Sequence, residues 1–224
     1  MFKGLLPVTS QRAGITTNGA LVNIPYRRPD GSLFRIRHVM GDKRWWGPGS
    51  GMLPYGLETL PNGFVARNAC LCITEGESDA LALRETLGEY CAGVFCLGCP
   101  GASAWKEEWE VYLDAFRFVV VLGDGDEAGD MFTRRVQSSY PRAVGACMPV
   151  GEDVRSVVQG ESADVVLEIV KECVELEAMV RKHFPWDGRQ RAAVEREVPA
   201  EEQTTIDMDG EAVPVTPIRR DSLS

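Results

Sequence analysis

The sequence has no long hydrophobic run and no overall excess of positive charge. No stretch of its 224 residues approaches the roughly 20 consecutive apolar residues that a membrane-spanning helix needs. Residues 1–14 also lack the apolar core and the cleavage site of a secretory signal peptide. Hydrophobic residues still make up 44% of the chain, which is enough to bury a core. We therefore expect a globular cytoplasmic protein without a membrane partner.

Paired cysteine motifs and nucleotide phosphate loops are also scarce. The seven cysteines, an odd number, lie mostly inside apolar runs, where a thiol is typically a small buried side chain in a reducing compartment, so we expect no disulfide. Those in apolar runs are Cys70, Cys72, Cys91, Cys96 and Cys147. Cys96 and Cys99 form a single CxxC pair, whereas a structural zinc site usually needs two. No GxxxxGKS or GxxxxGKT motif of the helicase type occurs.

The acidic charge is distributed unevenly along the chain. A formal net charge of −9 argues against a nucleic-acid partner, because proteins that bind phosphates normally have basic surfaces. Residues 1–70, however, contain nine Lys and Arg against three Asp and Glu, a net +6, and the remaining residues carry −15. A nucleic acid is therefore expected to contact the N-terminal part.

That N-terminal part has the pattern of a basic β-hairpin. Two alternating runs across residues 20–40 flank the turn cluster Pro29-Asp30-Gly31. Because side chains alternate along a strand, Arg35 and Arg37 share one face, and we expect that face to present cations while the other packs. The residues expected on the packed face are Phe34, Ile36, His38 and Met40.

The segment 41–63 is rich in Gly and Pro and is expected to form a surface loop. Its basic and aromatic residues are Lys43, Arg44, Trp45 and Trp46. Basic side chains bind phosphates and aromatic side chains stack on bases, so the loop is a candidate nucleic-acid contact.

From residue 69 onward, short apolar runs alternate with helical patterns, as in a parallel α/β sheet. Strands are predicted at 69–74, 93–97, 116–122 and 143–148. Helices are predicted at 78–90, at 104–115, from 128 onward and at 162–182. Residues 187–224 lack periodicity and are predicted to be mobile. The predicted domains are a small basic β-rich lobe (1–66), an α/β domain (67–185) and a mobile acidic tail (186–224).

Acidic motifs follow three of the predicted strands. They are Glu75-Gly76-Glu77-Ser78-Asp79, Gly123-Asp124-Gly125-Asp126 and Gly151-Glu152-Asp153. Because ligands bind at the carboxyl ends of parallel strands, these carboxylates are expected to converge there. Converging carboxylates repel one another unless a cation joins them, and hard ions such as Mg²⁺ take oxygen ligands. The turn Gly98-Cys99-Pro100-Gly101 offers amides that could hold a phosphate oxygen.

Residues 73–83 (ITEGESDALAL) and 119–129 (VVVLGDGDEAG) resemble the Toprim domain, which primases, topoisomerases, and certain nucleases and recombination proteins share. The resemblance covers about residues 69–160 and implies a Rossmann-like parallel sheet flanked by helices. Within that superfamily, DGDEAG and residues 149–159 (PVGEDVRSVVQ) resemble the catalytic cores of phage and bacterial DNA primases. Residues 24–38 (IPYRRPDGSLFRIRH) resemble the basic lobe that precedes the Toprim domain in phage primases.

The resemblance implies a role for each group of residues. The catalytic residues would be Glu75, Asp124 and Asp126. These three together with Asp153 would hold Mg²⁺ or Mn²⁺. Phosphates of a nucleotide would be bound at Gly76, Gly98, Gly101 and Gly125. Nucleic acid would be contacted by Arg35, Arg37, Lys43, Arg44 and Trp45.

The leading hypothesis is a primase catalytic core that makes short primers from nucleoside triphosphates on single-stranded DNA, with a separate replicative helicase as a candidate partner. One alternative is a Toprim nuclease, which uses similar metal-binding carboxylates to cleave phosphodiesters. Another is a non-catalytic nucleic-acid-binding or adaptor module. Topoisomerase activity is disfavoured, since it needs a tyrosine nucleophile on a further domain.

Overall fold

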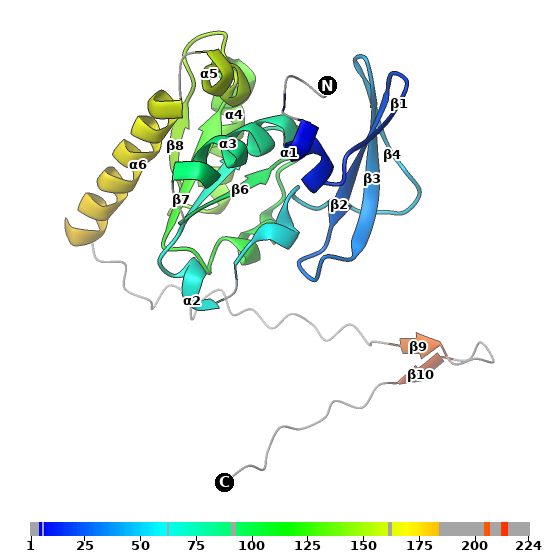
Figure 1. Cartoon of the computed structure of the whole chain (residues 1–224). Helices are drawn as coiled ribbons and strands as arrows, with labels where there is room; N and C mark the ends of the chain where they lie inside the picture. Colours follow the sequence, from blue (N-terminus) through cyan, green and yellow to red (C-terminus); the bar gives the residue numbers. More distant parts are fainter. Residues whose placement is uncertain are drawn as a thin grey trace. The chain divides into compact units, whose positions relative to one another are not determined.

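The protein is presented in Figure 1 as a computed structural model, in which the chain divides into two units, Met1–Lys182 and His183–Ser224. The structure describes residues 5, 7–61, 63–90, 93–160, 163–183, 204–206 and 212–214. In the second unit, β9 (Thr204–Ile206) and β10 (Ala212–Pro214) pair antiparallel. The other residues of the predicted tail lie outside the described residues, and the predicted domain boundaries stay predictions.

The N-terminal lobe begins with helix α1 (Pro7–Arg12) and continues as an antiparallel sheet with the strand order β1-β2-β3-β4. Its strands are β1 (Thr16–Asn18), β2 (Leu21–Arg27), β3 (Leu33–Met40) and β4 (Lys43–Trp46). The predicted hairpin is confirmed, because β2 pairs with β3 around a turn that contains Gly31 at φ 81°. The segment 43–46 was predicted as loop but forms β4, since Gly41 at φ 57° reverses the chain and lets it pair with β3.

The inward face of this sheet is the opposite of the predicted one. Val39, which shares a face with Arg35 and Arg37, is only 7% exposed, whereas Met40 is 43% exposed. The prediction that the arginine face is open to solvent was therefore wrong. The physical reason lies in β2, where the fully buried Tyr26 stands opposite Arg35 and packs on the same side. The arginine face is thus covered: Arg37 meets Glu77 of the α/β domain, and Arg35 binds carbonyls of the loop that follows β4.

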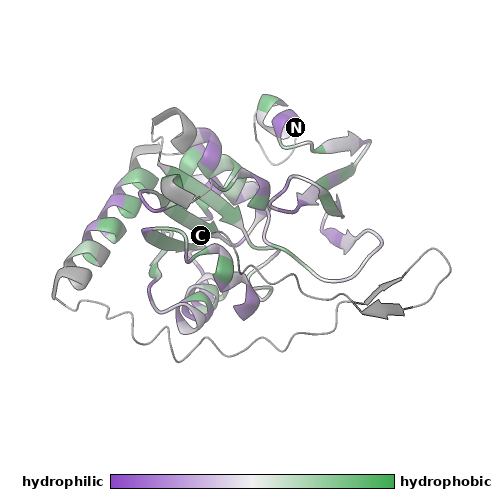
Figure 2. Ribbon diagram, turned by 90° about the horizontal axis from the view of Figure 1, so that it is seen from below, coloured by the Kyte–Doolittle hydropathy of each residue, from purple (hydrophilic) through white to green (hydrophobic). Residues whose placement is uncertain are grey.

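The second sheet is parallel throughout, with the strand order β6-β5-β7-β8. Its strands are β5 (Cys70–Thr74), β6 (Val94–Gly98), β7 (Phe118–Gly123) and β8 (Val144–Cys147). Alternating residues enter two separate hydrophobic clusters: Leu71 and Val121 join one, while Cys72 and Val120 join the other. Buried, nearly continuous apolar strands are typical of a parallel sheet covered on both faces, and they appear green in Figure 2. The predicted α/β fold class is confirmed.

Helices cover both faces of the parallel sheet. The helices are α3 (Glu77–Tyr90), α4 (Glu127–Ser139), α5 (Val154–Gly160) and α6 (Ala163–His183). Residues of α3, α5 and α6 pack into the cluster that contains Cys72, and residues of α4 pack into the cluster that contains Leu71. Three shorter helical elements are α2 (Gly63–Ala66), η1 (Leu57–Thr59) and η2 (Glu107–Tyr112).

Two helical assignments differ from the sequence-based prediction. The segment 104–115 contains only the 3-10 helix η2, because Lys106 is extended at φ −125° and ψ 138°, so no helix can run through from residue 104. Helix α5 was not predicted, because its seven residues are too few to give a clear helical period.

No helix among the described residues is long and apolar enough to cross a membrane. Six of the cysteines lie in the described residues and are free thiols; five are buried and Cys147 is exposed. Cys91, predicted to be buried, lies outside the described residues.

Candidate acidic site at the carboxyl ends of the parallel strands

The first two acidic motifs meet because their strands are neighbours. Glu75 directly follows β5 and Asp124 directly follows β7, and these strands pair in parallel with Thr74 opposite Leu122. The backbone N–H of Asp124 donates a hydrogen bond to Oε1 of Glu75 at 2.9 Å. Two residues that lie 49 positions apart in the sequence are therefore in direct contact.

The third acidic motif joins this end of the sheet through a loop pair. The backbone N–H of Gly125 donates to the carbonyl of Glu152 at 2.8 Å, and that of Gly151 donates to the carbonyl of Gly125 at 2.9 Å. The approach is so close that a Cβ on Gly125 would lie 1.9 Å from the carbonyl oxygen of Pro149. Glycine is therefore needed at position 125 for the two loops to meet.

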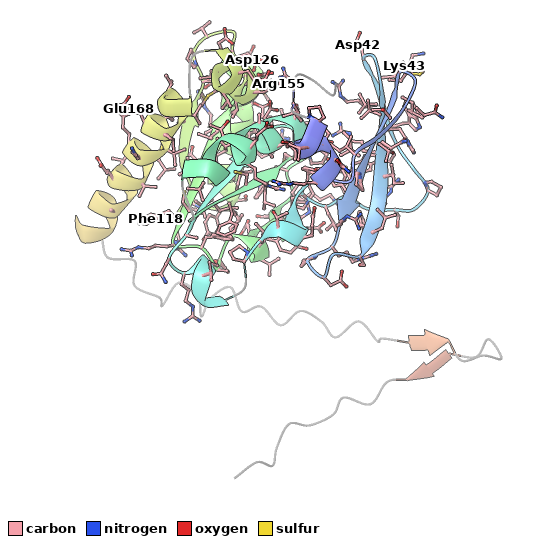
Figure 3. The ribbon with its side chains drawn as sticks, viewed as in Figure 1. Asp42, Lys43, Phe118, Asp126, Arg155 and Glu168 are labelled. Atoms are coloured by element: carbon pink, nitrogen blue, oxygen red, sulfur yellow. The ribbon has the colours of Figure 1, made fainter. Side chains whose placement is uncertain are left out.

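Asp126 and Asp153 each use part of their carboxylate within the protein. Oδ1 of Asp126 accepts from the backbone N–H of Gly129 at 2.8 Å and caps the N-terminus of α4. Oδ1 of Asp153 accepts from the backbone N–H of Ser156 at 2.6 Å, and its Oδ2 pairs with Arg155 at 2.5 Å. Asp126 and Arg155 are labelled close together in Figure 3. Asp153 is therefore neutralised by a cation of the protein itself, unlike Asp126.

Asp124 carries the strongest electrostatic perturbation of the site. Burial raises its pKa to about 7, and the nearby Glu75, Asp79, Asp153 and Asp126 carboxylates add to the shift. Burial also raises the pKa of Glu75, an effect that its hydrogen bond from the Asp124 amide opposes. Within the described residues, the buried Oδ1 of Asp124 has no hydrogen-bond partner. Such a group is costly when charged unless a cation or a donor meets it.

Asp124 and Asp126 line a depression of about 400 Å³ that is formed by residues of the segments 124–126 and 151–156. The donor set of Glu75, Asp124 and Asp126 has the chemistry that Mg²⁺ and Mn²⁺ prefer, and the orphaned Asp124 oxygen fits a cation at this place. Across the described ranges, no three acidic, His or Cys side chains already stand together as a ligand set. A bound cation would therefore have to draw its ligands closer.

Three of the predicted phosphate-binding glycines, Gly76, Gly98 and Gly101, lie where two turns pack closely against each other. The amide of Gly98 donates to the carbonyl of Tyr55 at 3.1 Å, and that of Gly101 donates to the carbonyl of Glu75 at 3.1 Å. A Cβ on Gly98 would lie 2.6 Å from the carbonyl oxygen of Gly76. These amides have protein partners, so their use for phosphate stays a prediction.

Glu77, the second glutamate of the first motif, is the first residue of α3 and links this helix to the antiparallel sheet. The hydroxyl of Tyr26 donates to Oε1 of Glu77 at 2.5 Å, and Nη1 of Arg37 lies 2.5 Å from the same oxygen. The Arg37 and Glu77 side chains are 12% and 11% exposed. Glu77 belongs to the first acidic motif of the sequence, but no signal in the sequence pointed to its pairing with an arginine forty residues earlier.

The predicted nucleic-acid contacts fall into two groups. Arg35 donates to the carbonyls of Gly51 and Gly47 at 2.8 and 2.6 Å, and Arg37 pairs with Glu77, so both point into the protein. The remaining predicted contacts lie exposed on β4 and are Lys43, Arg44 and Trp45. Trp45 is 42% exposed and stacks on His38 with ring centroids 5.4 Å apart. Figure 3 labels Lys43 at the end of the β3–β4 hairpin.

The strand order and the acidic turns define a Toprim-like domain. A family described as Toprim-like matches residues 72–158, from within β5 to within α5. The chain is 33% identical to the Gene 57 protein of Mycobacterium phage D29 over 168 residues. This aligned stretch covers 75% of this chain and 99% of the relative. The chain therefore belongs to the family of that phage protein and carries a Toprim-like domain.

Solved structures of primases share the fold. The primase fragment of the bacteriophage T7 primase-helicase protein is similar with a TM-score of 0.62 at 21% identity, over 75% of this chain and 72% of that chain. A DNA primase domain from Pseudomonas aeruginosa is similar with a TM-score of 0.54 at 20% identity, over 72% of this chain and 57% of that chain. The predicted resemblance to the Toprim superfamily and to primase catalytic cores is confirmed.

Proposed function

We propose that the protein is a primase catalytic core that synthesises short oligonucleotide primers from nucleoside triphosphates on single-stranded DNA. The observation that carries the proposal is the contact between Glu75 and Asp124, which joins two acidic motifs beside a depression at the strand ends. The fold similarity to the T7 primase fragment supports the same reaction class. A separate replicative helicase is the proposed partner, since that fragment comes from a primase-helicase protein.

The proposed chemistry is phosphoryl transfer at the acidic site. Glu75, Asp124 and Asp126 would hold Mg²⁺ or Mn²⁺, and Asp153 is a fourth proposed ligand once Arg155 releases it. A divalent cation held by these residues would lower the pKa of an attacking 3′ hydroxyl and balance the negative charge of a triphosphate. Glu75 accepts a hydrogen bond from the backbone N–H of Asp124 and so keeps the two acidic turns together while substrate binds.

The β4 strand is the proposed template contact. Lys43 and Arg44 lie exposed and can pair with phosphates, and the exposed part of Trp45 can stack on a base. Arg37 instead joins the basic lobe to the α/β domain through Glu77. Arg35 holds the loop that follows β4 through two backbone carbonyls.

A primer-synthesis assay tests the proposal. The protein is incubated with single-stranded DNA, labelled nucleoside triphosphates and Mg²⁺ or Mn²⁺, with and without the replicative helicase of its host or phage. Short labelled products that need both template and metal are expected, and Asp124→Asn should abolish them. Arg134→Gln, at a side chain that is 81% exposed on α4, serves as the matched control and should remain active.

Other products would contradict the primase assignment. Shortening of the DNA in the absence of triphosphates would identify a nuclease that uses the same carboxylates. If wild-type protein binds DNA but neither extends nor cleaves it under any of these conditions, the proposal is wrong and a binding or adaptor role replaces it.

A further inference from the structure

A second cavity lies on the other flank of helix α3, apart from the acidic turns. It has a volume of about 550 Å³ and is formed where α1, the end of β2, η1 and α3 meet. This volume is within the range of roughly 300–1,000 Å³ that is typical of small-molecule sites. No residue of the acidic turns lines it, so the cavity is separate from the candidate metal site. We call it the arginine pocket, after the lining residues Arg12, Arg27 and Arg84.

The arginine pocket contains unusually many charges without ion pairs. Besides the three arginines, Glu58 and Glu85 line it, which leaves one net positive charge. Among the described residues, none of these five side chains forms an ion pair within 4.0 Å. Charged groups that gather in a cavity without pairing are expected to meet a charged ligand.

Two of the arginines are held in place while most of their donors stay available. Nη1 of Arg27 donates to the carbonyl of Gly31 at 3.0 Å, and Nη2 of Arg84 donates to the carbonyl of Cys96 at 3.1 Å. A guanidinium group has five N–H donors in a planar fork that matches phosphate oxygens. Arginines anchored through one donor are therefore preorganised to bind phosphate with the others.

Glu58 adds a requirement of the opposite kind. Its Oε2 is buried and, within the part of the chain that the structure describes, has no hydrogen-bond partner. A buried acceptor without a donor lowers stability, and a ligand N–H or O–H would satisfy it. The ligand should thus carry anionic groups and, a short distance away, a hydrogen-bond donor.

We propose that the arginine pocket binds a nucleoside phosphate, with Arg12, Arg27 and Arg84 on the phosphates and Glu58 accepting from the sugar or the base. The lining also contains the apolar residues Val8, Ala13 and Leu81, which suit the flat face of a base or sugar. The proposal does not depend on the primase assignment. Binding here needs no metal, because arginines contact the phosphates directly, whereas the acidic turns repel a nucleotide unless a cation is present.

Isothermal titration calorimetry in EDTA tests the proposal with ATP, GTP, CTP, UTP and inorganic triphosphate as probes. We expect saturable binding of at least one nucleoside triphosphate by the wild-type full-length chain. Arg12→Gln and Arg27→Gln should each weaken it by about tenfold or more, the usual effect of losing one charge-assisted contact to phosphate. Glu58→Ala should reduce the preference for the nucleoside triphosphate over inorganic triphosphate, because only the former has donors for Glu58.

Two matched controls locate the ligand. Arg134→Gln removes an exposed arginine outside the pocket and should leave the affinity unchanged. Asp124→Asn alters the acidic turns and should also retain binding in EDTA. The proposal is overturned if none of the four nucleoside triphosphates binds without metal, if Arg134→Gln weakens binding as much as Arg12→Gln, or if the nucleotide preference is the same in Glu58→Ala. Binding that appears only with Mg²⁺ and disappears in Asp124→Asn would place the nucleotide at the acidic site instead.

Discussion

At the scale of single residues, the charges around Asp124 oppose one another when no cation is present. Burial raises the pKa of its half-buried carboxylate, and the nearby charges of Glu75, Asp79, Asp153 and Asp126 raise it further. Asp124→Asn should therefore make the metal-free protein more stable than wild type at pH 8, where all these groups are charged in the unfolded chain. In contrast, Mg²⁺ at a hundredfold excess over its Kd should stabilise wild type by about 2.7 kcal/mol and leave the variant unchanged.

Thermal unfolding with EDTA or Mg²⁺ measures both effects. Glu168→Gln is the matched control, because Glu168 is exposed on α6 and Figure 3 labels it apart from Asp126. That variant should respond to Mg²⁺ as wild type does. If Asp124→Asn retained the full Mg²⁺ response, the cation would not be bound through Asp124.

Gly125 gives a second test at this scale. A methyl group at this position would meet the carbonyl oxygen of Pro149 at 1.9 Å, so the loops that carry Asp124 and Glu152 must separate. Gly125→Ala should destabilise the protein by roughly 1–3 kcal/mol, as overpacked sites do. Gly160→Ala, where a Cβ meets nothing within 4 Å, should be near neutral. Urea unfolding compares the two variants, and equal midpoints would show that the loops do not pack this closely.

The sequence predicted which acidic residues cluster but not how each is paired. Glu75 and Asp124 follow predicted parallel strands, so their proximity could be expected from topology alone. The ion pair of Asp153 with Arg155 could not, since it depends on the unpredicted helix α5. In the same way, Gly125 was interpreted as making room for phosphate, whereas a neighbouring loop occupies the space beside it.

At the scale of elements, the β-rich lobe and the α/β domain are joined through the carboxylate of Glu77. Its Oε1 is shared by Tyr26 of β2 and Arg37 of β3, and all three side chains are largely buried. Burial raises the pKa of Tyr26 well above its usual value, and the Glu77 charge adds to this, so the tyrosine remains a hydrogen-bond donor.

Removal of the Glu77 charge should be costly because it leaves Arg37 buried and unpaired. Glu77→Gln is expected to lower the free energy of unfolding by roughly 3–5 kcal/mol, as for other buried ion pairs that lose one partner. Glu108→Gln removes the exposed pair with Lys106, whose side chains are 35% and 67% exposed, and should cost about 1 kcal/mol or less. Denaturant titration measures the free energy of unfolding of both variants. Tyr26→Phe and the double variant complete a double-mutant cycle that gives the coupling between Tyr26 and Glu77. Similar losses for Glu77→Gln and Glu108→Gln would contradict a buried bridge.

The elements themselves were largely predictable, and the orientation of the lobe was not. Apolar runs such as 118–122 predict buried parallel strands, and the turn at Gly31 predicts the hairpin. Which face of β3 packs cannot be read from alternation, because both faces contain long side chains. Arginines were assigned to solvent by their charge, yet Arg35 and Arg37 bury their stems and place each guanidinium on oxygens of another segment.

At the scale of the whole molecule, the uneven distribution of charge decides which part of the chain attracts a polyanion. Residues 1–70 carry a net +6 and the rest −15, so a polyanion is drawn toward the β-rich lobe and away from the other surfaces. Within that lobe, however, Arg35 and Arg37 are used by the protein, which leaves β4 as an exposed basic edge. Lys43 and Arg44 should thus contribute to the attraction of single-stranded DNA at this edge.

The salt dependence of DNA binding tests this concentration of charge. Each phosphate contact to a single strand contributes about −0.7 to the slope of log K against log salt concentration. Lys43→Gln and Arg44→Gln should each weaken binding and make that slope shallower by about this amount, without changing the unfolding midpoint, because both side chains are exposed. Fluorescence anisotropy with labelled single-stranded DNA at several salt concentrations provides the measurement, and Arg134→Gln should keep the wild-type slope. If the Lys43 and Arg44 variants kept that slope as well, the DNA would be held elsewhere, and the exposed edge of β4 would not be its binding surface.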